Sequence, residues 1–191
     1  MPSGRGFIDE AQVAQIAAAV APSPAAADTF LLTARNRAGA IAEQHAVAGT
    51  TTLQLVDHVP HGELQRLRLL RSGVRLVQVI HVTGEASAAE ALALAPFVDA
   101  LLLDSGNPAL AVKELGGTGR THALSRRIRD AVWPLPLYLA GGLSADNVAA
   151  AMHAVSPFGL DLCSSVRSQG RLDAARLQAF MAAVAAANPV N

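Results

Sequence analysis

Apolar segments rich in β-forming residues recur along this chain at nearly regular intervals. They are centred near residues 31, 54, 78, 101, 138 and 162, and most of them are about 23 residues apart. The intervening segments carry apolar residues at helical spacing, as at Leu64, Leu67 and Leu70. This interval suits a strand followed by a crossover helix, and it is too long for a hairpin. The sequence therefore predicts six strands in one parallel sheet covered by helices.

Two architectures satisfy this pattern: an open doubly wound sheet, or a (β/α)8 barrel with pieces missing. A length of 191 residues fits one domain, 1–191. The expected strands are 29–33, 51–56, 75–80, 98–103, 135–139 and 160–163. The expected helices include one that starts after Asp9, and others at 37–48, 61–71, 87–94 and 174–187.

Composition excludes several classes of protein. The 15 basic and 15 acidic residues balance, which argues against binding nucleic acid through a general basic field. The single cysteine, Cys163, excludes an intramolecular disulfide and fits a reducing compartment. No apolar run reaches the length of a membrane span, and the N-terminus lacks the apolar core of a signal peptide. We therefore expect a cytoplasmic protein without nucleic-acid or membrane partners.

Small and polar residues follow three of the expected strands, as Asp104-Ser105, Gly141-Gly142 and Ser164-Ser165. Ligands of parallel α/β proteins bind at these strand ends, and phosphate needs backbone N–H groups more than charge. A further glycine loop lies at 115–121, and it matches neither of the two common nucleotide-binding motifs. A Walker loop needs glycine at the position of Glu114, and a dinucleotide-binding fingerprint needs glycine at the position of His122. We interpret these loops as phosphate-binding; the plain alternative is that the glycines only turn the chain.

Four motifs, in their order and spacing, resemble phosphoribosylanthranilate isomerase: Leu-Leu-Asp-Ser at 102–105, Gly-Gly-Thr-Gly-Arg-Thr at 116–121, and the segments 140–148 and 157–166. The resemblance is weaker upstream, where 53–56 is similar to the family's fourth strand and 3–7 to the loop after its second strand. It implies a (β/α)8 TIM barrel that lacks the first strand, the first helix and the second strand. Such unpaired strand edges would predict dimerisation, aggregation or marginal stability.

The resemblance implies an isomerase (an intramolecular oxidoreductase) that performs an Amadori rearrangement of N-(5'-phosphoribosyl)anthranilate in tryptophan biosynthesis, without metal or organic cofactor. Asp104 matches the family's acid, which protonates the ribose ring oxygen. The plain alternative is an aspartate that caps a turn. The same resemblance assigns substrate binding to Arg5, Gly116, Gly117, Gly119, Gly141, Gly142, Ser164 and Ser165.

The sequence departs from the family at the base that removes the C2 proton. The family uses a cysteine at the end of its first strand, and no residue here matches it, so we expect slow or absent turnover. His81, His122 and Cys163 are candidate substitutes, although Cys163 is predicted to be a small core residue on a strand. Arg167 replaces a glutamate, and it either contacts the phosphate or lies in solvent.

Two other functions remain open at this point. One is a non-catalytic relative that binds a phosphorylated sugar and has lost the base. The other is a different sugar-phosphate isomerase of the same barrel superfamily. Each reading implies a small phosphorylated sugar as ligand, and a homodimer is compatible with each.

Overall fold

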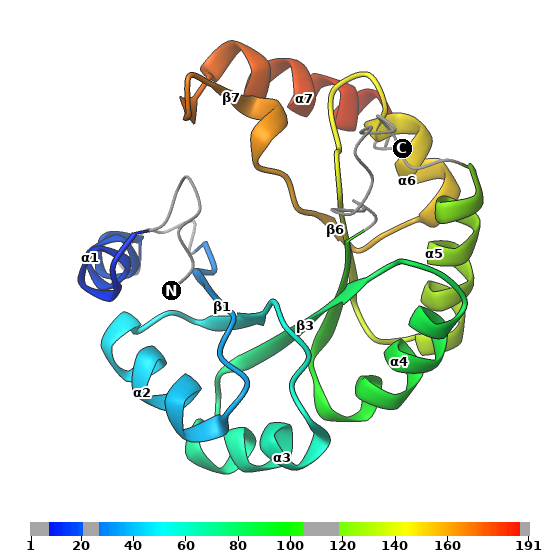
Figure 1. Ribbon diagram of the computed structural model, residues 1–191. Helices are drawn as coiled ribbons and strands as arrows, with labels where there is room; N and C mark the ends of the chain where they lie inside the picture. Colours follow the sequence, from blue (N-terminus) through cyan, green and yellow to red (C-terminus); the bar gives the residue numbers. More distant parts are fainter. Residues whose placement is uncertain (1–7, 21–26, 105–118, 188–191) are drawn as a thin grey trace. The chain divides into compact units, whose positions relative to one another are not determined.

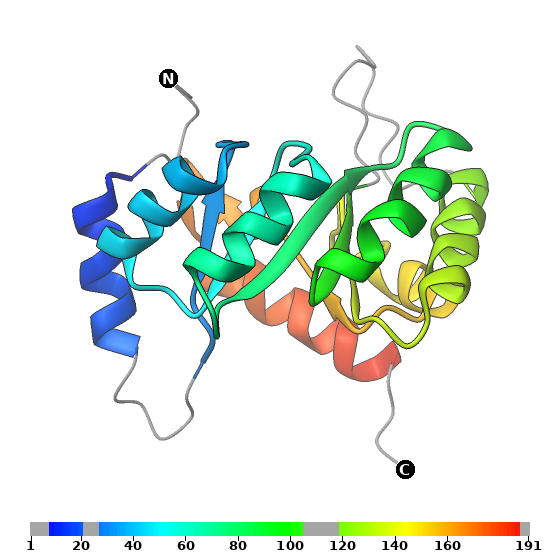
Figure 2. The same cartoon turned by 90° about the horizontal axis from the view of Figure 1, so that it is seen from below.

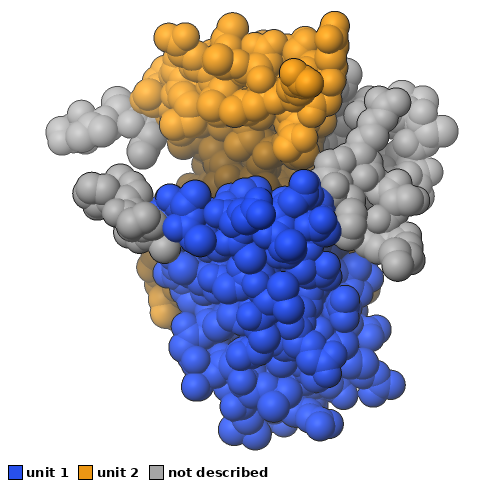
Figure 3. All heavy atoms as spheres, turned by 90° about the vertical axis from the view of Figure 1, so that its left-hand side faces the viewer, with its two compact units in different colours: residues 1–79, 94–100 blue, residues 80–93, 101–191 orange. Residues whose placement is uncertain are grey.

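The computed structural model describes residues 8–20, 27–104 and 119–187. Its strands follow the order β1-β2-β3-β4-β5-β6 in one sheet, which confirms the predicted succession. The chain forms two compact units, residues 1–79 with 94–100 and residues 80–93 with 101–191 (Figure 3). Within the described residues, no helix has both the length and the apolar character needed to cross a membrane.

The first unit contains alternating helices and strands. Its elements are α1 (Glu10–Val20), β1 (Phe30–Thr33), α2 (Ala38–Ala48), β2 (Thr52–Leu55), α3 (His61–Leu70), most of β3 (Arg75–His81) and the 3₁₀ turn η1 (Ala95–Phe97). β2 pairs in parallel with both β1 and β3. The helices α1, α2 and α3 lie next to one another (Figures 1 and 2). Between helices and strands the core is aliphatic, with Leu31, Ile41, Leu53, Leu55, Leu64, Leu67 and Leu76 buried.

Local signals in the sequence set the helix ends of this unit. Asp9 precedes α1, and its Oδ1 accepts the backbone N–H of Gln12 at 2.7 Å, as an N-cap does. Gly49 ends α2 with φ of 63°, and its N–H donates to the carbonyl of His45 at 2.9 Å. Both helix ends were predicted, and the structure confirms them.

The second unit contains the remaining elements. They are the end of β3, α4 (Ala86–Leu94), β4 (Ala100–Asp104), α5 (Gly119–Val132), β5 (Leu137–Ala140), α6 (Val148–Val155), β6 (Gly159–Leu160), the 3₁₀ turn η2 (Ser164–Val166), β7 (Arg167–Ser168), β8 (Arg171–Leu172) and α7 (Ala174–Ala187). β5 pairs in parallel with β4 and with β6. The buried residues include Ile80, Leu101, Leu103, Ile128, Leu137, Leu139 and Val155.

The strand predicted at 160–163 is wrong in its second half. The N–H groups of Phe158 and Asp161 donate to β5 carbonyls at 2.7 and 2.9 Å, so pairing is limited to the surroundings of Gly159–Leu160. Cys163 then adopts φ of −138° and ψ of −68°, which takes the chain out of the extended conformation and into η2. Cys163 is exposed, so its prediction as a core residue on a strand is also wrong.

A short antiparallel ribbon after η2 was missed by the sequence analysis. β7 pairs with β8, and the connecting residues Gln169 and Gly170 both have positive φ, 51° and 79°. Two consecutive residues of positive φ are typical of a tight hairpin turn whose twist matches that of the strands. Each strand has only two residues, which is too short for an alternation pattern to reveal it.

The N-terminus of α2 is capped by a residue of α3. Arg37, which precedes α2, makes no side-chain cap, and the carboxylate of Glu63 instead accepts the N–H of Ala38 at 2.6 Å. Arg37 Nη1 also lies 3.4 Å from Glu63 Oε1. The hydrogen bond from Ala38 holds the pKa of Glu63 below its ordinary value of 4.5, with a smaller contribution from the Arg37 guanidinium, while desolvation opposes both. A carboxylate here also interacts favourably with the helix dipole.

Replacing this carboxylate should lower stability in a pH-dependent way. We expect Glu63→Gln to unfold at lower urea concentration at neutral pH, because the amide carries no charge. A lowered pKa in the folded state gives stability that is present above pH 4.5 and is lost as pH falls through the folded-state pKa. The difference between wild type and Glu63→Gln should therefore shrink on acidification, measured by circular dichroism. Glu43→Gln, an exposed change on α2, is the control; a difference independent of pH would refute the cap.

Candidate active site

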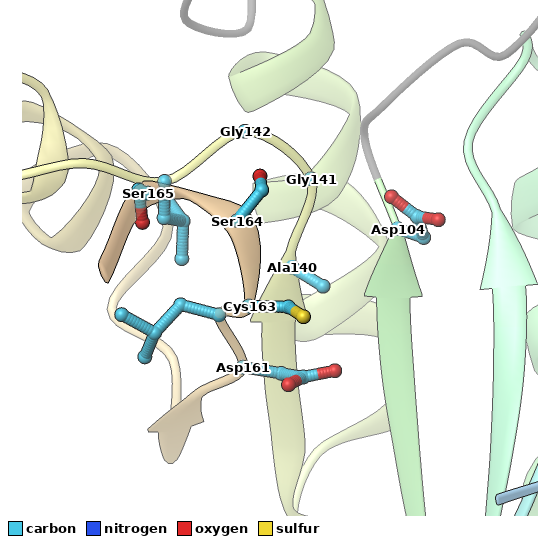
Figure 4. Close-up of a pocket in the computed structure, with 10 residues that line it drawn as sticks. Asp104, Ala140, Gly141, Gly142, Asp161, Cys163, Ser164 and Ser165 are labelled. Atoms are coloured by element: carbon cyan, nitrogen blue, oxygen red, sulfur yellow. The ribbon is translucent and has the colours of Figure 1, made fainter. Parts of the chain in front are cut away.

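An open pocket of about 220 Å³ lies at the C-terminal ends of β4, β5 and β6, within the second unit (Figure 4). It is lined by Asp104, by residues 140–143 and by residues 161–165. The pocket therefore brings together five of the predicted site residues, namely Asp104, Gly141, Gly142, Ser164 and Ser165. Parallel pairing explains this gathering, because it carries the ends of adjacent strands to one edge of the sheet.

Gly141 and Gly142 form the wall contributed by β5. Their φ angles are 95° and 70°, a region that glycine adopts without steric cost. Asn147 fixes the turn that follows, since its Oδ1 accepts the Ser144 N–H at 2.8 Å and its Nδ2 donates to the Gly142 carbonyl at 3.0 Å. α6 starts only after Asn147, so this turn separates the two glycines from the helix.

Ser164 and Ser165 form the wall that follows β6. Ser164 is exposed, while the Oγ of Ser165 is buried and finds no hydrogen-bond partner among the described residues. A buried hydroxyl of this kind is satisfied when a ligand or water supplies the missing hydrogen bond. The described lining includes no lysine, arginine or histidine, so an anion would be bound there by hydroxyl and backbone N–H groups.

Arg167 does not join the pocket in this structure. Its Nη1 donates to the carbonyl of Gly170 at 3.4 Å, within the β7–β8 ribbon, and its own carbonyl accepts Nη1 of Arg176 at 2.9 Å. Of the two roles considered for this residue, the geometry favours an exposed position on the ribbon over contact with a phosphate.

Asp104 occupies the end of β4, opposite Ala140 in the parallel register. Its carbonyl accepts the N–H of Val82 at 2.9 Å, which joins the ends of β3 and β4. Its carboxylate Oδ2 lies 3.5 Å from Nδ1 of His81. A carboxyl group in this position can transfer a proton to a ligand held in the pocket.

Asp161 and Cys163 also line the pocket. The sequence analysis considered Cys163 only as a candidate substitute base, and it did not place Asp161 in the site. Figure 4 shows the carboxylate of Asp161 and the sulfur of Cys163 directed toward the side on which Asp104 lies. Asp161 was missed because it lies inside the strand expected at 160–163. The pocket thus combines two carboxylates with one thiol. Within the described chain, no group of three His, Cys, Asp or Glu side chains is arranged to hold a metal ion.

The other predicted residues are less informative. Arg5, Gly116 and Gly117 lie outside the described residues, and Gly119 is the first residue of α5. His122 lies in the first turn of α5, where burial lowers the pKa of its imidazole. It is not among the described residues that line the pocket.

Comparison with known proteins points to one family. The model of the N-(5'-phosphoribosyl)anthranilate (PRA) isomerase family matches residues 34–183. The N-(5'-phosphoribosyl)anthranilate isomerase of Nostoc punctiforme is 37% identical over 162 residues, which is 83% of this chain and 74% of that protein. The enzyme of the same name from Synechococcus elongatus is 33% identical over 181 residues, 94% of this chain and 80% of that protein.

Solved structures agree at the level of the fold. The phosphoribosyl anthranilate isomerase of Thermotoga maritima superposes with a TM-score of 0.80 at 20% identity, covering 97% of this chain and 84% of that one. A phosphoribosyl anthranilate isomerase in complex with reduced 1-(o-carboxyphenylamino)-1-deoxyribulose 5-phosphate gives a TM-score of 0.74 at 20% identity, covering 94% and 81%. These likenesses confirm the predicted α/β fold of the TIM-barrel type. The family match and the identities show that this chain belongs to the N-(5'-phosphoribosyl)anthranilate isomerase family.

Proposed function

We propose that this chain catalyses the Amadori rearrangement of N-(5'-phosphoribosyl)anthranilate in tryptophan biosynthesis. The observation that carries this proposal is that Asp104 and the two small-residue strand ends line a single pocket in a chain of this family. The relatives named above carry this activity in their names, and one solved relative holds a reduced ribulose phosphate compound.

The chemistry assigns different roles to different walls of the pocket. Asp104 donates a proton to the ring oxygen of the ribose, and the bond between that oxygen and C1 breaks to leave an imine. A base then removes the C2 proton, and the enolamine tautomerises to the ketone. Gly141, Gly142, Ser164 and Ser165 bind the phosphate through backbone N–H and hydroxyl groups, and the unpaired Ser165 hydroxyl supports this assignment. Arg5, Gly116, Gly117 and Gly119 complete the proposed binding set.

Turnover of purified protein with phosphoribosylanthranilate, followed by fluorescence, tests the proposal directly. Complementation of a tryptophan auxotroph is an independent measurement. Phosphorylated-sugar binding without turnover would favour the non-catalytic alternative. Sedimentation of the same sample tests the predicted homodimer.

Removing the acid should reduce the rate and leave binding in place. We expect Asp104→Asn to lower kcat by about 10²–10⁴, the range that general acid catalysis contributes. KM should change little, because the proposed phosphate contacts lie in the loop after β5 and on η2. Asp130→Asn, on α5 and outside the described pocket lining, is a matched control. Undiminished turnover in Asp104→Asn would remove Asp104 from the mechanism.

A charge placed in the proposed phosphate cradle should block anion binding. The space around a Cβ at position 142 is open within 4 Å, so Gly142→Asp introduces mainly strain and negative charge. Gly142→Asn is the matched control, because asparagine has the same size and tolerates positive φ. We expect phosphate affinity, measured by calorimetry, to fall by more than about tenfold in Gly142→Asp relative to Gly142→Asn. Equal affinities would place the cradle elsewhere.

Cys163 is the first candidate for the base that removes the C2 proton. Its thiol is exposed and lines the same pocket as Asp104. We expect Cys163→Ser to lower kcat by about 10²–10⁴ while phosphate binding persists. His122→Gln, outside the described pocket lining, should leave the rate near that of wild type. The reverse pattern would identify His122 as the substitute base.

A further inference from the structure

We propose that His81 supplies Asp104 with the proton that Asp104 delivers, so that the two side chains work as one proton-carrying pair. The inference rests on the proposed isomerase function and adds to it a positioning residue that acts through Asp104. His81 ends β3, Asp104 ends β4, and both belong to the second unit.

The imidazole lies beside the carboxylate, and it is the more exposed of the two groups. Nδ1 of His81 lies 3.5 Å from Oδ2 of Asp104, and 45% of the His81 side chain is exposed against 32% of the Asp104 side chain. A separation of 3.5 Å is slightly longer than a hydrogen bond, and catalytic contacts are often long before a ligand binds. A small rotation of either side chain therefore suffices for proton transfer.

Hydrogen bonds hold the backbone of this pair in place. Val82 donates its N–H to the Asp104 carbonyl at 2.9 Å, immediately after His81. On the other side, the hydroxyl of Ser87 donates to the His81 carbonyl at 3.1 Å and accepts the N–H of Thr83 at 3.1 Å. Ser87 is only 3% exposed, so this connection is protected from water. The position of His81 beside Asp104 is thus fixed by the fold.

Asp104, and not Glu85, is the carboxylate that lies beside His81. Glu85 is the next acidic residue along the chain, and its Oε1 pairs with Nη1 of Arg127 at 2.9 Å. Glu85 thus has its own cationic partner, while His81 lies beside Asp104.

The proposed reaction requires Asp104 to be protonated again after each turnover. Each turnover leaves Asp104 as a carboxylate, because its proton has moved to the ring oxygen, and the next turnover requires a new proton. Imidazole is the side-chain group that exchanges protons readily near neutral pH. A proton passes from solvent to Nε2 of the imidazole, and the Nδ1 proton passes to the Asp104 carboxylate. The proton that the base took from C2 returns to solvent, so no net proton is consumed, and exchange with solvent restores the Nδ1–H tautomer of His81. Asp104 then acts as the acid while His81 restores it.

Nitrogen-15 spectroscopy of the histidine side chains tests the pair without any need for turnover. We expect Nδ1 of His81 to carry a proton in the wild type, and that population to fall in Asp104→Asn. His45 is an internal control, because its Nε2 lies 2.7 Å from the Thr50 carbonyl and its signals should not change. Identical His81 signals in the two proteins would overturn the pair. Since this measurement is independent of catalysis, an inactive wild type would contradict only the proposed function.

Kinetics test whether the pair works as a unit. We expect His81→Gln and His81→Ala to lower kcat by about ten- to a hundredfold and to leave KM unchanged. This loss in kcat is at or below the smallest contribution that a general acid or base usually makes. Imidazole in the buffer should restore part of kcat in His81→Ala. The double variant with Asp104→Asn should be no slower than Asp104→Asn alone, because groups that act as a unit are not additive. His153→Gln, an exposed change on α6, is the control. Additive losses, or no rescue by imidazole, would overturn the relay.

Discussion

The parallel hydrogen bonding of β4, β5 and β6 is the constraint on which the pocket depends. The register sets Asp104 opposite Ala140, and the Asp161 N–H donates to the Leu139 carbonyl at 2.9 Å. The three strands therefore end at the same edge of the sheet. Side chains alternate between the two faces of a strand, so a slip of one residue would turn Asp104 to the opposite face. The buried residues of β4 resist such a slip, because both faces of this strand are packed and the slip would exchange the side chains that fill each face.

This arrangement separates two chemical tasks within one pocket. In the proposed mechanism, the ends of β3 and β4 carry the groups that exchange protons, and the loops after β5 and β6 carry the glycine and serine residues proposed to bind phosphate. Among the described lining residues there is no cation, so a bound anion would be neutralised by oriented backbone groups, which involve no side-chain rotamer.

Much of this could be predicted from the sequence because the relevant signals are local. Apolar runs spaced for strands joined by crossover helices predicted all six strands. Asp9 marked the start of a helix through its side-chain cap, and Gly49 marked the end of another through its positive φ. Five residues of the predicted site also meet in one pocket, because strand ends in a parallel sheet converge.

The failures involve interactions that no local pattern encodes. The end of β6 depends on the dihedral angles of Cys163, and the start of α6 depends on a turn tied by the side chain of Asn147. The β7–β8 ribbon has too few residues to show a period. The contact between His81 and Asp104 joins residues 23 positions apart, and it follows from strand pairing, which the sequence alone predicts only in outline.

The cap that α3 provides for α2 has a consequence for synthesis on the ribosome. Glu63 follows Ala38 by 25 residues, so the N-terminus of α2 emerges from the ribosome before its capping carboxylate does. An isolated helix of 11 residues is marginal in water. During translation, α2 therefore lacks this cap until α3 has emerged, and the hydrogen bond from Ala38 to Glu63 stabilises the two helices together.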